Sequence, residues 1–127
     1  MNTLFSLLRY DSAVRRLTEV FGRAAEQTMV YGAAGALKHA AAAASYDAAP
    51  RPLAVVTAGR EALRGWQEDL TALLPEADIY ELPELDRIDF AAPGTAKGLE
   101  RSAQRMNILA RLLRHEPIIV LADIGAA

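Results

Sequence analysis

The chain has 127 residues, of which 52% are hydrophobic and 24% are charged. This composition is that of a globular protein and excludes an intrinsically disordered one. The length is sufficient for one domain, and the net charge of −2 gives no overall electrostatic reason to expect binding to nucleic acid or to an anionic membrane. We therefore expect a single globular domain.

The residue types that are missing exclude several kinds of site. The chain has no cysteine, which excludes disulfides, a thiol nucleophile and a metal held by thiolates. Its two histidines, His39 and His115, are far apart, so a zinc site or a Ser-His-Asp triad has little support. The apolar stretch at residues 4–8 is too short for a secretory signal, and no run of about 18 apolar residues could span a bilayer. The sequence predicts a cytoplasmic protein.

The first half of the chain alternates helical and β-prone segments. Residues 11–21 have apolar side chains at helical spacing, which predicts an amphipathic helix with Asp11 or Ser12 as its N-cap. Residues 28–31, Thr-Met-Val-Tyr, predict a short buried strand. Residues 36–46 are rich in alanine, with five in a row at 40–44, which favours a slim helix that can lie close to a sheet.

The second half of the chain continues this alternation. Residues 53–57 and 118–122 are apolar throughout, as expected for parallel strands covered on both faces. The segments between them predict, in chain order, a helix over 59–74 with Trp66 in its apolar stripe, a strand over 78–82, a loop over 83–98 and a helix over 99–115. Four strands separated by helices indicate an α/β fold, a three-layer parallel sheet with helices on both faces.

The helix over 99–115 has a regular pattern. An apolar line, which an amphipathic helix turns toward the core, comprises Leu99, Ala103, Met106, Ala110 and Leu113. The opposite, polar line comprises Glu100, Gln104, Asn107, Arg111 and Arg114.

The turn after the first predicted strand, residues 32–39, partly matches a phosphate-binding loop. That loop has the pattern G-x-x-x-x-G-K-[ST], in which glycines let backbone N–H groups surround phosphates and a hydroxyl holds magnesium. Gly32, Gly35 and Lys38 are present, but Leu37 stands where a glycine is required and His39 where the hydroxyl is required. We interpret the segment as a degenerate loop retained for close packing; a working ATP site is the alternative.

Two further features could carry chemistry. Asp123 follows an apolar strand, as a Walker-B acid does, although an aspartate there is more often a turn or cap residue. The second feature is a basic face for phosphates or an acidic partner, formed by Arg101, Arg105, Arg111 and Arg114. Interleaved glutamates favour an ordinary solvated helix face instead. The acidic side chains of the 81–89 region have no spacing that supports general acid–base catalysis.

The order and spacing of modest motifs resemble the extreme N-terminus of the bacterial transcription-repair coupling factors (Mfd). Matches extend over nearly the whole chain, at residues 30–38 (VYGAAGALK), 51–57 (RPLAVVT), 68–70 (EDL), 73–75 (LLP), 92–93 (AP), 104–105 (QR), 108–109 (IL) and 117–120 (PIIV). In that family the segment opens a module similar to the excision-repair protein UvrB, with a RecA-like sheet whose phosphate loop has decayed. UvrB itself would carry a complete G-x-x-G-x-G-K-T loop, which this chain lacks.

The resemblance implies a non-catalytic part of a much longer protein. Residues 1–26 would form a helical lead-in and residues 27–127 a degenerate RecA-like, P-loop-like half domain. The parent would be an ATP-dependent DNA translocase that removes stalled RNA polymerase and recruits nucleotide excision repair through UvrA. ATP and magnesium would bind its motor domains beyond residue 127, and no cofactor is expected here. The alternatives are a P-loop NTPase or helicase fragment using Lys38 and Asp123, and a DNA-binding module using the arginines of residues 101–114.

Overall fold

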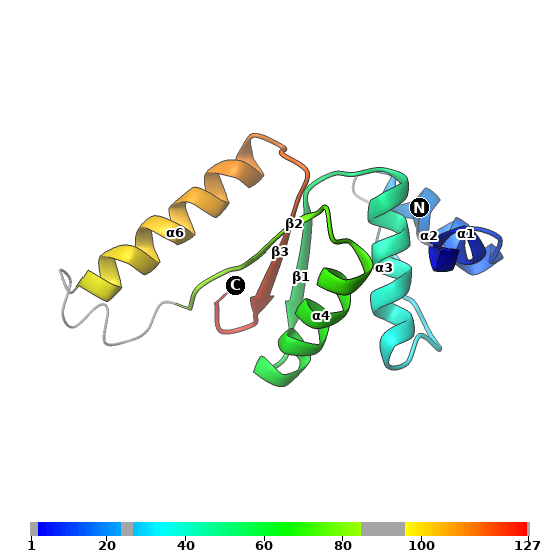
Figure 1. Cartoon of the computed structure of the whole chain (residues 1–127), viewed down its shortest axis with the longest axis horizontal. Coiled ribbons are helices and arrows are strands. Elements are labelled where there is room, and N and C mark those ends of the chain that lie inside the picture. Colours follow the sequence, from blue (N-terminus) through cyan, green and yellow to red (C-terminus); the bar gives the residue numbers. More distant parts are fainter. Residues whose placement is uncertain (1–2, 24–26, 85–95, 127) are drawn as a thin grey trace. The chain divides into compact units, whose positions relative to one another are not determined.

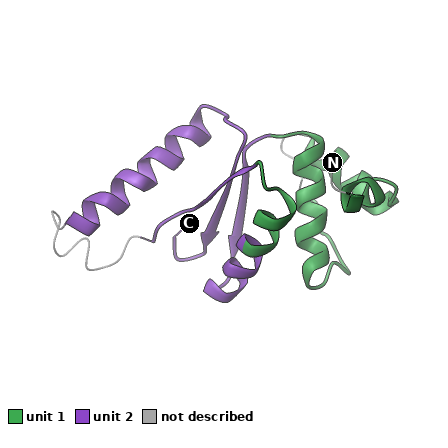
Figure 2. Cartoon of the chain, in the orientation of Figure 1, with its two compact units in different colours: residues 1–50, 68–76 green, residues 51–67, 77–127 purple. Residues whose placement is uncertain are grey.

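The computed structural model describes residues 3–23, 27–84 and 96–126. They form two compact units, which Figure 2 distinguishes by colour. Unit 1 comprises Met1–Pro50 and Glu68–Glu76, and unit 2 comprises Arg51–Gln67 and Ala77–Ala127. The division passes through helix α4 (Arg60–Leu73), so each unit includes one part of that helix.

Unit 1 is built from helices, α1 (Thr3–Leu8), α2 (Ser12–Phe21), α3 (Ala36–Ala48) and the second part of α4 (Figure 1). Asp11 is the N-cap of α2, because its carboxylate accepts hydrogen bonds from the backbone N–H groups of Ala13 and Val14 at 2.8 and 3.1 Å. The sequence-based predictions of α2 and α3 are confirmed, and α3 extends two residues beyond the predicted end at residue 46.

The alanines of α3 form much of the core of unit 1. Ala43 and Ala44 are buried, and α2 and α1 both contact α3. Small side chains allow this close approach of helices, and polar side chains also join them. The hydroxyls of Thr18 and Ser45 lie 3.4 Å apart, and an ion pair of 3.0 Å joins Arg9 at the end of α1 to Asp47.

The strand predicted over 28–31 is wrong. These residues form no strand, and Met29 and Tyr31 are 73% and 82% exposed. The β propensity of Thr-Met-Val-Tyr is satisfied only when a neighbouring strand pairs with it, and propensity alone does not supply that neighbour. The segment instead lines a groove beside α2 and α3.

Unit 2 contains a three-stranded sheet with the order β1-β3-β2, formed by β1 (Leu53–Thr57), β2 (Asp78–Glu81) and β3 (Ile118–Asp123). Both pairings are parallel, with Leu53 opposite Ile119 and Asp78 opposite Ile118. The chain therefore has an α/β fold with a small parallel sheet, as the alternating pattern predicts. The expectation that the first of these strands is covered on both faces is wrong, because Val56 of β1 is 55% exposed.

Helix α6 (Ala96–Leu113) packs on the sheet through a face that the periodicity did not predict. Ile108 and Leu112 contact the core of unit 2, which comprises Leu82, Ile118, Val120 and Ala122 with Tyr80 beside them. The predicted core residues Leu99, Met106 and Leu113 are 61%, 65% and 82% exposed. The helix has apolar side chains on two sides, and a regular spacing alone does not decide which side faces the sheet.

The remaining predicted boundaries hold with small shifts. Helix α4 begins at Arg60 and ends at Leu73, within the predicted span, and Leu63 and Leu70 of its apolar stripe are buried. Helix α6 begins at Ala96, so the loop predicted over 83–98 extends too far at its C-terminal end. Residues 85–95 of that predicted loop lie outside the described part of the chain. Across the described segments, no helix has the length and apolar character to cross a membrane.

Candidate functional site

The turn before α3 depends on two glycines. Gly32 and Gly35 have φ angles of 79° and 57°. Residues with a Cβ atom rarely adopt such positive φ angles. The N–H of Ala34 donates to the carbonyl of Gly32 at 3.1 Å, and the N–H of Leu37 donates to the carbonyl of Ala34 at 3.2 Å. Gly35 is the N-cap of α3 and supplies no side-chain cap. The glycines therefore shape the entry to α3 through their φ angles. The close packing expected of them is wrong, because residues 28–31 form no strand and a Cβ atom on either glycine would meet no described heavy atom within 4 Å.

The residues at the end of this turn point to different environments. Lys38 is exposed in the first turn of α3, whereas His39, the next residue, is buried. The Nδ1 atom of His39 lies 2.5 Å from an Oδ atom of Asp69 in the second part of α4. The side chain at the position of the missing hydroxyl thus makes a polar contact within the helices of unit 1. Sequence reasoning missed Asp69, because only the fold brings it to a histidine thirty positions earlier.

An apolar groove of about 590 Å³ lies beside the turn, within unit 1. Its lining combines the apolar face of α2 with the extended segment and the first turns of α3, including Val14, Leu17, Val20, Met29, Val30, Tyr31, Leu37 and Ala41. Leu37 is half exposed and contributes an isobutyl side chain where a phosphate loop has a glycine. The surface beside the degenerate loop is therefore mostly apolar.

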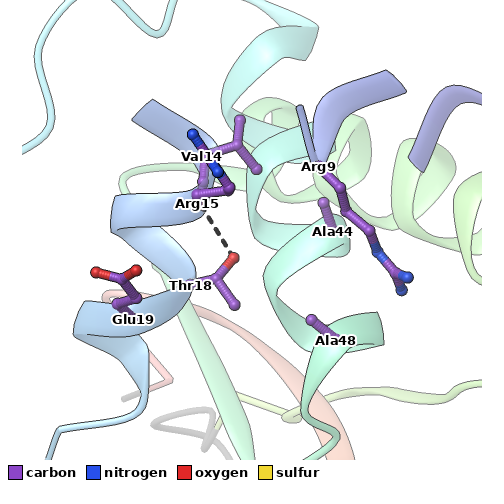
Figure 3. A pocket seen from close by; sticks show the side chains of 7 residues that line it. All are labelled: Arg9, Val14, Arg15, Thr18, Glu19, Ala44 and Ala48. Atoms are coloured by element: carbon purple, nitrogen blue, oxygen red, sulfur yellow. Dashed lines mark hydrogen bonds between the residues drawn. The ribbon is translucent and has the colours of Figure 1, made fainter. Parts of the chain in front are cut away.

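A second hollow of about 380 Å³ lies between α2 and α3 (Figure 3). Its lining includes Val14, Ala44 and Ala48, with Arg9, Arg15, Thr18 and Glu19 also contributing. Two of the polar side chains already have contacts, since Arg9 pairs with Asp47 and Thr18 donates to the carbonyl of Val14 at 2.9 Å. The hollow is thus a shallow gap beside small alanine side chains rather than an assembled set of catalytic groups.

Asp123 has the geometry of a turn residue. It is the last residue of β3, opposite Thr57 of β1, and its carboxylate accepts a hydrogen bond from the N–H of Gly125 at 3.3 Å. This contact matches the turn role expected of an aspartate after a strand. Asp123 belongs to unit 2, whereas the turn at residues 32–39 belongs to unit 1.

The four arginines of the predicted basic face have different surroundings. Arg105 donates to the backbone carbonyls of Pro83 and Ala126 at 2.9 and 2.7 Å, which connects α6 to the segments that follow β2 and β3. Arg101 is partly buried, and Arg114 is exposed and pairs with Glu116 at 3.3 Å. DNA binding through this helix stays a prediction.

Arg111 contacts several polar side chains of unit 2. Its guanidinium group pairs with Glu116 at 2.5 Å and Asp78 at 3.2 Å, donates to the hydroxyl of Tyr80, and lies 5.1 Å from the centre of that ring. The hydrogen bonds to Glu116 and Asp78 raise the pKa of Arg111, and the hydrogen bond from Arg111 lowers the pKa of Glu116. Arg111 therefore acts as a structural cation that joins α6 to β2.

The end of α6 places Glu116 for this contact. The N–H of His115 donates to the carbonyl of Leu112 at 3.0 Å, and the N–H of Glu116 donates to the carbonyl of Arg111 at 3.1 Å. These are the two hydrogen bonds of a Schellman motif. His115 has a φ of 55°, the left-handed conformation that usually takes a glycine. The motif turns the chain from α6 into β3 and returns Glu116 to Arg111.

No protein-family model, curated protein or solved structure matches the chain. Within residues 3–23, 27–84 and 96–126, no group of three or more histidine, aspartate or glutamate side chains could hold a metal ion.

The contact between His39 and Asp69 yields a first prediction. Replacing the buried histidine (His39→Ala) removes this contact and leaves a gap in unit 1, so we expect the free energy of unfolding to fall by about 1–3 kcal/mol. The exposed neighbour Lys38 is the matched control, because Lys38→Ala should change the free energy of unfolding by less than about 0.5 kcal/mol. Chemical denaturation followed by circular dichroism measures both. Equal effects of the two substitutions would contradict the structural role of His39.

The lowered pKa of Glu116 predicts a pH dependence. A carboxyl group whose pKa is lower in the folded state stabilises the fold above its unfolded pKa, and this contribution disappears as the pH falls through the folded value. Glu116→Gln should therefore lower the free energy of unfolding at pH 7. The difference in this free energy between the variant and the unsubstituted chain should become smaller at pH values below 4.5, the ordinary carboxyl pKa. Denaturation midpoints measured across this range test the prediction. A difference that is constant with pH would exclude it.

Proposed function

We propose that the chain is a non-catalytic α/β scaffold, the first part of a UvrB-like docking module in a transcription-repair coupling factor. The sequence resemblance supports this assignment, since its matched motifs extend over nearly the whole chain. The alternation of helices with parallel strands is also consistent with it. In the proposal the sheet is the beginning of a three-layer, RecA-like half domain, and α1 and α2 belong to its helical lead-in.

The observation that carries the proposal is the state of the turn at residues 32–39. Two positions that a phosphate loop needs are committed to other contacts, because Leu37 lines an apolar groove and His39 contacts Asp69. Lys38 keeps the lysine of the motif and is exposed. A lysine beside a helix N-terminus attracts anions weakly, but it neither surrounds a triphosphate nor holds magnesium. This arrangement supports a scaffold role over nucleotide hydrolysis.

The proposal places the chemistry elsewhere in a longer protein. ATP and magnesium would bind motor domains that follow residue 127, and the translocase would act on DNA and stalled RNA polymerase through those domains. UvrA would be engaged by a part of the module outside this chain. The role of the present chain would be to support that module and hold it against the remaining domains of the same protein.

Nucleotide binding separates the scaffold from its alternative, a weakly binding P-loop NTPase. We expect isothermal titration calorimetry with Mg-ATP to show no binding, because Leu37 and His39 replace the glycine and the hydroxyl of the motif. The double variant Leu37→Gly/His39→Thr, checked for folding by circular dichroism, is the matched gain-of-function comparison. Micromolar binding by the unsubstituted chain that Lys38→Ala abolishes would overturn the scaffold assignment.

The assignment to a coupling factor is tested separately by the coding sequence beyond codon 127. We expect it to encode a further motor with a complete G-x-x-x-x-G-K-[ST] loop, because a translocase needs at least one working nucleotide site. If that motor is found, residues 1–127 expressed alone should bind the remaining part of the protein in a pull-down. A reading frame without such a motor would contradict this assignment, whatever the outcome of the ATP titration.

A further inference from the structure

Helix α6 carries an exposed apolar stripe on the side away from the sheet core. Leu99, Met106 and Leu113 recur at intervals of seven residues and are 61%, 65% and 82% exposed. Ala103 and Ala110 recur at the same interval between them. This α6 stripe lies entirely within unit 2, and its inner counterpart, Ile108 and Leu112, already packs on the sheet (Figure 2).

A surface of this kind indicates a binding face. An α-helix that covers a sheet normally exposes polar side chains on its other side, and contiguous exposed apolar patches on a folded protein mark interaction sites. The spacing of four and three residues repeats over the length of the helix, which is the heptad pattern of helices that pair along a seam. The α6 stripe therefore has the form of one half of a helix–helix interface.

We propose that the α6 stripe binds the same stripe of a second copy of this chain, with the two α6 helices antiparallel. Met106 of each copy then packs beside Ala110 of the other, and Ala103 packs beside Leu113. Met106 and Leu113 each meet an alanine, so the helices approach closely and the interface is self-complementary about a two-fold axis, with Leu99 at each end beyond these pairs. This inference does not depend on the proposed function.

The charges beside the stripe favour this arrangement. In the antiparallel register just described, Glu100 of one copy lies opposite Arg114 of the other, and two-fold symmetry repeats the pair. Both side chains are exposed, that of Arg114 to 62%, and Arg114 also pairs with Glu116 of its own chain at 3.3 Å. Asn107 lies opposite Asn107 of the second copy on the same flank. On the other flank Leu109, which is 37% exposed, lies opposite its own equivalent.

Other pairings of two α6 helices lack this complementarity. Parallel helices would place Leu109 beside Arg114 of the second copy, which buries an apolar side chain against a charged one and pairs no opposite charges. An antiparallel register shifted by one heptad would place Glu100 opposite Asn107 and leave each Arg114 outside the seam. A charge pattern that suits only one register is how paired helices specify their partner and orientation.

The first test measures the mass of the 127-residue chain in solution by sedimentation equilibrium. We expect a concentration-dependent dimer of twice 13.7 kDa. Met106→Glu, which places two like charges near the two-fold axis, should give the monomer. Gln104→Glu is the matched control, because it makes an exposed charge change on the same helix outside the stripe and should leave the dimer intact. A monomer at every concentration, or equal effects of both variants, would overturn the proposal.

The second test addresses the register. Glu100→Arg and Arg114→Glu should each weaken the dimer about tenfold, because each replaces two attractive cross-copy pairs by repulsive ones. The double variant Glu100→Arg/Arg114→Glu restores opposite charges and should return the dissociation constant to within about twofold of the original. Additive weakening in the double variant would exclude the antiparallel register.

Chemical crosslinking supplies an independent test, because the chain contains no cysteine. Asn107→Cys introduces one thiol per chain beside the two-fold axis, and a short bismaleimide should join two copies in high yield. Gln104→Cys is the control, because Gln104 is exposed but lies outside the α6 stripe, and it should give little crosslinked product. If Gln104→Cys crosslinks as well as Asn107→Cys, the copies do not meet along the α6 stripe.

Discussion

The parallel sheet depends on the pairing of β3 with a strand on each side. Within the described part of the chain, β1 and β2 do not pair with each other, and each pairs with β3 alone. The side chains of β3 from Ile118 to Ala122 are buried, which places a continuous apolar strand at the centre of unit 2. The contacts of Arg105 and Arg111 then hold α6 beside this sheet.

The turn at residues 32–39 is a structural element that leads into α3. Its glycines keep the backbone conformation that leads into α3, although the groups needed for a nucleotide are replaced. His39 contributes a polar contact in the interior of unit 1, and Leu37 adds apolar surface beside it. The glycines therefore serve the backbone path of this turn, whereas the side chains at positions 37 and 39 contribute to the surface and the interior of unit 1.

Much of the fold could be predicted from local pattern. The N-cap Asp11, the alanine-rich α3 and the apolar runs of β1 and β3 each specify their structure through nearby residues. The predictions that were wrong required knowledge of distant neighbours. Residues 28–31 have the propensity for a strand but no strand beside them, and α6 has two apolar sides between which periodicity cannot choose. The contact between His39 and Asp69 could likewise not be predicted from the sequence, because only the packing of two helices brings these residues together.

The position of β3 in the chain has a consequence for synthesis on the ribosome. Its neighbours β1 and β2 are synthesised before it. Leu53 of β1 therefore has no pairing partner until Ile119 is made, and Asp78 of β2 has none until Ile118 is made. Parallel pairing between such distant segments closes slowly, and unpaired apolar strands can associate with other chains in the meantime. The helices α1, α2 and α3, of which the first two contact the third, are all synthesised before β1. A nascent chain interrupted before residue 118 thus lacks the strand on which its whole sheet is assembled.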